Sequence, residues 1–93
     1  MEIDSIRNKA LRRFFEEGVS KGLPEPARIG RMLAFIVATQ RFEEFIIPPN
    51  YGFHPLTGDR KGSFAMTVTR NWRMTFTRLD ENVVGELDLE DYH

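Results

Sequence analysis

The chain has 93 residues, which is enough for one small domain but not for two independent hydrophobic cores. Its 41% hydrophobic and 29% charged residues are typical of a globular protein, and the lack of cysteine excludes disulfides, thiolate chemistry and cysteine-ligated zinc. The net charge is only −1, yet residues 48–78 carry a net +4 and residues 79–93 a net −6. The basic segment could contact a few phosphates, or it could pair with the acidic strand that follows.

The N-terminal third of the chain is predicted to form two helices. Asp4 and Ser5 are favourable N-cap residues, Gly18 is a favourable C′ residue, and apolar residues recur at helical spacing between them. After the turn-like VSKGLPEP, residues 27–39 have the pattern of a second, more buried helix, and RFEEFI could add a separate turn. A short loop between two helices predicts an antiparallel helix hairpin.

The rest of the chain is predicted to be a turn-rich loop followed by strands. Residues 46–62 are rich in proline and glycine, which predicts an ordered loop without a long regular element. SFAMTVT, WRMTFTRL and VVGELDLEDY each alternate in polarity, which predicts three antiparallel strands joined by tight turns at RN and DEN. In the last strand the alternation assigns two faces: Val83, Gly85, Leu87 and Leu89 inward, and Val84, Glu86, Asp88, Glu90 and Tyr92 outward, with Glu86, Asp88 and Glu90 on a solvated face.

This order of elements predicts an α+β fold with two layers, in which the helix hairpin packs on the apolar face of a three- to four-stranded antiparallel sheet. The fourth strand would be a short edge strand at MEID. Trp72 shares its parity with Met74 and Phe76, so we expect it to lie mostly in the core. One domain should span residues 1–93, in the cytoplasm and without a membrane segment, because the longest apolar run is MLAFIVA and no signal-peptide pattern is present.

Both histidines fall outside the predicted core elements, with His54 in the loop and His93 at the end of the chain, after Asp91 and Tyr92. The start of the first meander strand and the end of the third lie at opposite ends of the sheet, so His54 approaches His93 only if the loop runs back across it. Two imidazoles could then act as base and acid in RNA cleavage by 2′-hydroxyl attack.

Phosphate chemistry also needs fixed cations, which Arg60, Lys61 and Arg73 could supply. The histidine spacing does not match a zinc-binding motif, and the acidic residues are spread along one strand. We therefore expect a reaction without metal or cofactor.

The segment HPLTGDRKGSFAMTVTRNWRMTFT, followed by the terminal DYH, resembles the HigB branch of the RelE/ParE superfamily of toxin–antitoxin toxins. The resemblance covers essentially the whole chain and implies the RelE-like form of the α+β fold. It implies a ribosome-dependent endoribonuclease that cleaves mRNA in the decoding site. It also implies a cognate HigA-like helix-turn-helix antitoxin, through which alone the toxin would associate with operator DNA.

The resemblance assigns roles to seven positions. The implied catalytic residues are His54, Asp91, Tyr92 and His93. The implied phosphate-binding residues are Arg60, Lys61 and Arg73. The two histidines would serve as acid and base, and the terminal carboxylate beside His93 favours the acid role for that residue.

The charge of the chain departs from the family pattern, because such toxins are generally basic and this chain is slightly acidic. We therefore expect a weaker, salt-sensitive affinity for RNA. Two alternatives stay open: a ParE-like, non-catalytic inhibitor of DNA gyrase, and an inactive relative that serves as an antitoxin-binding module. For the gyrase inhibitor the imidazoles would be dispensable, whereas for the inactive module expression would be harmless.

Overall fold

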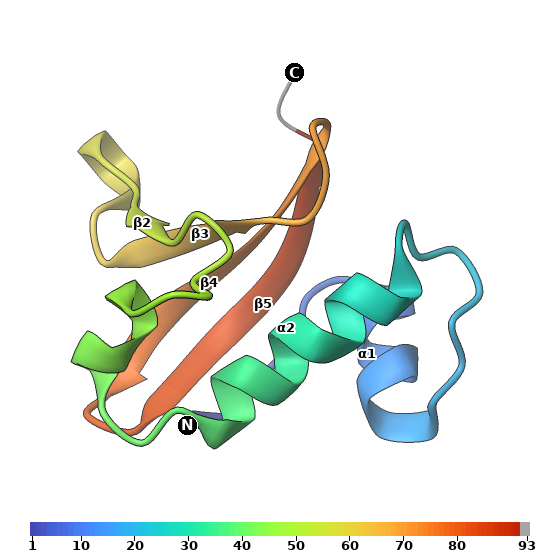
Figure 1. The fold of residues 1–93 in the computed structure, drawn as a ribbon, viewed down its shortest axis with the longest axis horizontal. Helices are drawn as coiled ribbons and strands as arrows, with labels where there is room; N and C mark the ends of the chain where they lie inside the picture. The colour runs from blue at the N-terminus through green and yellow to red at the C-terminus, as the bar shows by residue number, and fades with distance from the viewer. Residues whose placement is uncertain (92–93) are drawn as a thin grey trace.

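The computed structural model describes residues 1–91, shown in Figure 1. In chain order its elements are β1 (Glu2–Ile3), α1 (Lys9–Glu17), α2 (Pro26–Ala38), the 3₁₀ helix η1 (Phe42–Ile46), β2 (His54–Pro55), the 3₁₀ helix η2 (Gly58–Arg60), β3 (Ser63–Thr67), β4 (Trp72–Asp80) and β5 (Val83–Asp91). The strands form one sheet in the order β1-β5-β4-β3-β2, and the helices pack on one face of it. The predicted α+β arrangement is confirmed. In the part of the chain described, neither helix has the length and apolarity that crossing a membrane requires.

The sheet is larger than predicted, with five strands instead of three or four, and it is mixed instead of antiparallel. The three central strands pair antiparallel as expected. The N-terminal segment adds the expected edge strand, but β1 runs parallel to β5. The loop adds β2, antiparallel to β3, and its proline lies on a sheet edge, where a missing N–H is tolerated.

Helix α1 begins later than its sequence pattern indicated. Asn8 is the N-cap, and its Oδ1 accepts the N–H of Leu11 at 2.8 Å. The prediction that Asp4 or Ser5 would cap this helix is wrong, because that segment instead runs along β5. Gly18 ends the helix in the left-handed conformation, with a φ of 75°, as predicted.

A bulge in β5 changes which of its residues face the core. Glu86 and Leu87 together lie opposite Phe76, and Glu86 takes a left-handed backbone conformation with a φ of 52°. The Oγ of Ser5 accepts the Glu86 N–H at 2.9 Å, so the backbone donor released by the bulge keeps a partner. Val84 is therefore fully buried, and the outward position predicted for it is wrong.

The core lies between the helices and the inner face of the sheet. The helices α1 and α2 pack closely at Gly30, where an added Cβ would lie 3.6 Å from the Phe14 ring. Trp72 is half-buried against this core, as its parity predicted. The fully buried residues of α2 and the sheet include Ile29, Met32, Ile36, Met66, Met74, Val84 and Leu87.

Candidate active site

The sheet has an outer face, turned away from the helices, on which three of the predicted site residues lie. Residues directly opposite one another on paired strands point to the same face. The strand register forms a row across the sheet from His54 on β2 through Ala65 on β3 and Thr75 on β4 to Asp88 on β5. Both neighbours of Ala65 along β3 pack in the core, so this row belongs to the outer face.

The position of His54 depends on the aromatic residue before it. The ring of Phe53 stacks on Phe45 and on Phe64, with 5.2 Å between ring centroids in both pairs and interplanar angles of 8° and 13°. Strand alternation then turns His54 away from the core, and its side chain is exposed. A two-residue strand with few hydrogen bonds is therefore held in register by aromatic packing behind it.

The His54 ring has a hydrogen bond between Nδ1 and the backbone carbonyl of Gly52 at 3.0 Å. A carbonyl oxygen only accepts, so Nδ1 must carry the proton in this contact. In the neutral ring, Nε2 then has its lone pair available. This tautomer is the one that a general base acting through Nε2 requires.

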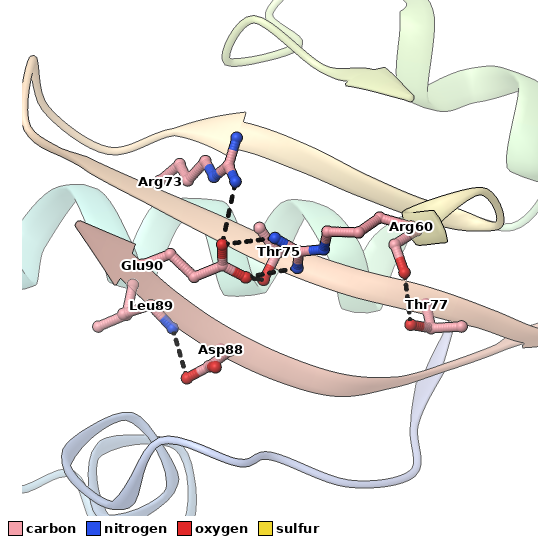
Figure 2. Close-up of polar contacts among 8 residues, drawn as sticks. Arg60, Arg73, Thr75, Thr77, Asp88, Leu89 and Glu90 are labelled. Carbon is pink, nitrogen blue, oxygen red and sulfur yellow. Dashed lines mark hydrogen bonds and ion pairs between the residues drawn. The ribbon is translucent and has the colours of Figure 1, made fainter. Parts of the chain in front are cut away.

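Glu90 on β5 is the centre of a polar network on the outer face, shown in Figure 2. Its Oε1 accepts from Arg60 Nη1 at 2.8 Å and from Arg73 Nη2 at 3.0 Å. Its Oε2 accepts from Arg60 Nη2 at 2.6 Å and from the Thr75 hydroxyl at 2.7 Å. Four donors thus fill the accepting capacity of one carboxylate, and the Arg60 pairing is bidentate.

The electrostatics follow from this geometry. Hydrogen bonds from Arg60, and then from Thr75 and Arg73, lower the pKa of Glu90 from 4.5 to about 2 although partial burial opposes the shift. The same carboxylate raises the pKa of Arg60. The carboxylate is therefore ionised at neutral pH, and the three side chains together carry a net charge of about +1.

The sequence pattern missed the role of Glu90, which was expected on a solvated strand face. Its side chain is 22% exposed, and it makes ion pairs with both arginines. The signal was present in the charge distribution, since the basic segment 48–78 and the acidic segment 79–93 meet in the cross-strand pair of Arg73 and Glu90. Which acidic residue meets the arginines depends on register, which alternation alone did not provide.

Two other predicted site residues, Lys61 and Asp91, lie at the ends of elements. Lys61 directly follows η2 and is exposed. Asp91 is the last residue of β5, lies opposite Trp72 and is exposed. Tyr92 and His93 lie outside the described residues.

His54 and Asp91 are not in contact. They lie on β2 and β5, which are three strand spacings apart, or roughly 14 Å across the sheet at ~4.8 Å per spacing. For His54 to approach the C-terminal end, the loop has to run back across the sheet, and the loop does run back along β3. It places His54 opposite the middle of that strand. The structure thus brings His54, Arg60 and Arg73 to one face, and leaves Asp91 at the far end of β5.

A hollow of about 140 Å³ adjoins the Glu90 network on the outer face. Its charged lining residues are Arg7, Asp59, Arg60, Glu86, Asp88 and Glu90. Carboxylates outnumber cations there, so the hollow itself does not favour a phosphate group. Across residues 1–91, no three His, Cys, Asp or Glu side chains are placed to hold a metal ion.

Comparison with known proteins identifies the family of the chain. Residues 4–93 match the family profile described as "RelE-like toxin of type II toxin-antitoxin system HigB". The chain is also 39% identical over 94 residues to Endoribonuclease HigB of Proteus vulgaris, an alignment that covers 98% of this chain and 99% of that protein. A match over nearly the whole length, on the fold described above, means that the chain belongs to the HigB family of RelE-like toxins of type II toxin–antitoxin systems.

Proposed function

We propose that this toxin is a metal-independent endoribonuclease that cleaves mRNA on the ribosome and so inhibits translation. The observation that carries the proposal is the outer face, which presents the Nε2 of His54 together with two guanidinium groups. The name of the Proteus vulgaris relative, an endoribonuclease, supports the same chemistry. The cytoplasm is the proposed place of action, since mRNA is the proposed substrate.

In the proposed reaction, His54 Nε2 takes the proton of a ribose 2′-hydroxyl, and the oxygen attacks the adjacent phosphorus. The bond from O2′ to phosphorus forms and the bond from phosphorus to O5′ breaks, which leaves a 2′,3′-cyclic phosphate. His93 would donate the proton to O5′, and Asp91 and Tyr92 would orient the groups around it. Arg60, Lys61 and Arg73 would stabilise the negative charge that builds on the phosphate.

We further propose that the partner protein is a HigA-like helix-turn-helix antitoxin, and that operator DNA is reached only through it. The family description supports an antitoxin, because a type II system pairs a toxin with an inhibitory protein. Co-expression with the protein encoded next to this chain tests the pairing: rescue of growth and a stable complex on gel filtration are expected. Unchanged growth arrest would contradict it.

The catalytic proposal is tested by inducible expression of the wild-type chain and of His54→Gln and His93→Gln. We expect wild-type expression to stop translation and to create new mRNA 5′ ends within reading frames, and each variant to lose both effects while keeping its circular-dichroism spectrum. Full toxicity of both variants would contradict the assignment. If both variants stay toxic, if expression causes DNA damage, and if the purified chain stops supercoiling by gyrase, the chain is instead a gyrase inhibitor.

A further inference from the structure

Glu90 joins two cations that come from separate parts of the chain. Arg60 belongs to η2, at the tip of the β2–β3 connection, and Arg73 belongs to the central strand β4. The guanidinium group of Arg60 and that of Arg73 approach the Glu90 carboxylate from different sides (Figure 2). Without this carboxylate, two like charges would face one another across the same surface, and repulsion would drive them apart.

An arginine side chain has several rotatable bonds, so holding the whole side chain in one conformation costs rotamer entropy. The bidentate contact with Glu90 fixes the plane of the Arg60 guanidinium before any ligand arrives. The contact uses two of the five N–H groups of Arg60, so three N–H groups are not engaged by Glu90. A held guanidinium of this kind can still donate to a phosphate on its other edges.

We propose that Glu90 is a positioning residue of the ribonuclease site, which holds the guanidinium groups of Arg60 and Arg73 in the arrangement that receives the RNA phosphate. The inference rests on the proposed phosphate-binding role of these arginines. Thr75 completes the arrangement, because its hydroxyl donates to the carboxylate oxygen that also pairs with Arg60 Nη2. Glu90 itself does not touch the substrate, since its two oxygens are already filled by protein donors.

The test measures mRNA cleavage on purified ribosomes by the wild-type chain, Glu90→Gln and Glu90→Asp. Gln removes the charge at nearly constant shape, and Asp keeps the charge but is shorter by one methylene. We expect both variants to lower kcat about tenfold or more, because small displacements of groups around a reacting centre have effects of this size. KM should not rise in Glu90→Gln, since removing a negative charge does not weaken attraction to RNA.

Asp88→Asn is the matched control, because it removes the same charge two residues earlier on β5. Asp88 Oδ1 accepts the Leu89 N–H, and within residues 1–91 no ion pair links Asp88 to either arginine. We expect this variant to cleave within about twofold of the wild type. Circular dichroism at the assay temperature should show all variants folded.

Two further measurements separate positioning from a general structural effect. In a background that carries both Arg60→Ala and Arg73→Ala, Glu90→Gln should cause less than about a twofold further loss, since residues that act through one another are non-additive. In the wild type, the Arg60 Nε–H signal in nuclear magnetic resonance should show an ordered side chain, and in Glu90→Gln a mobile one.

Three results would overturn the inference. Unchanged cleavage by Glu90→Gln would show that the arginines need no holding. A full multiplicative loss in the background without both arginines would show that Glu90 acts elsewhere. Faster cleavage by Glu90→Gln would mean that the carboxylate competes with the RNA phosphate. Absence of cleavage by the wild-type chain would refute the proposed function itself, and is recognised because the wild type is measured first.

Discussion

The Glu90 network makes stability depend on pH in a way that can be calculated from the structure. The folded pKa of about 2 lies below the ordinary value of 4.5. A group with a lowered folded pKa stabilises the protein above its unfolded pKa, and this stabilisation is lost as pH falls through the folded pKa. The contribution should therefore be complete above about pH 5 and largely gone near pH 2.

The size of the contribution follows from the same difference. At ~1.36 kcal/mol per pH unit, it corresponds to at most about 3 kcal/mol. The Arg60 side chain is 41% exposed, so water and salt screen part of this interaction, and about 2 kcal/mol is the expected value. For a domain of this size that amount is a large share of the total stability.

The assay is urea unfolding of the wild type and Glu90→Gln at pH 7 and pH 3, followed by the fluorescence of the half-buried Trp72. Gln has nearly the shape of protonated Glu, so the two free energies of unfolding should differ by about 2 kcal/mol at pH 7 and converge at low pH. Asp88→Asn should show a much smaller difference at pH 7. A Glu90→Gln difference below about 0.5 kcal/mol at pH 7, or one equal at pH 7 and pH 3, would refute the reasoning.

Three other predictions concern the elements that support the site. Asn8→Ala should cost about 1 kcal/mol in urea unfolding because the cap of α1 is lost, and Asp4→Ala should cost clearly less; equal losses would contradict the capping assignment. Gly85→Ala should cost about 1–2 kcal/mol, because its Cβ would lie 2.5 Å from Leu79 Cδ1 and 3.0 Å from Ser5 Oγ. Adding Leu79→Ala should recover only part of the loss, since the contact with Ser5 remains; full recovery would contradict a clash with Ser5. Phe53→Ala should cost about 2–3 kcal/mol and speed amide hydrogen exchange in the β2–β3 pairing, because the packing behind β2 is removed; unchanged exchange would argue against that role.

Local patterns in the sequence were sufficient for much of the fold. Helical spacing located α1 and α2, Gly18 marked the end of α1, and alternation located the three central strands. These signals depend on residues only a few positions apart. The residues proposed to carry the chemistry were chosen from the sequence, since imidazole and guanidinium side chains suit phosphate chemistry wherever the fold places them.

Only the tertiary structure decided how these elements meet. The parallel pairing of β1, the edge strand that carries His54 and the bulge at Glu86 all depend on segments far apart in the chain. The ion pairs of Glu90 show this dependence on long-range pairing most clearly. Alternation indicated a solvated residue, whereas the register places Glu90 opposite Arg73 and within reach of Arg60. Periodicity specifies the face on which a side chain lies, but its neighbours on that face are set by long-range strand pairing and by burial of the core behind the sheet.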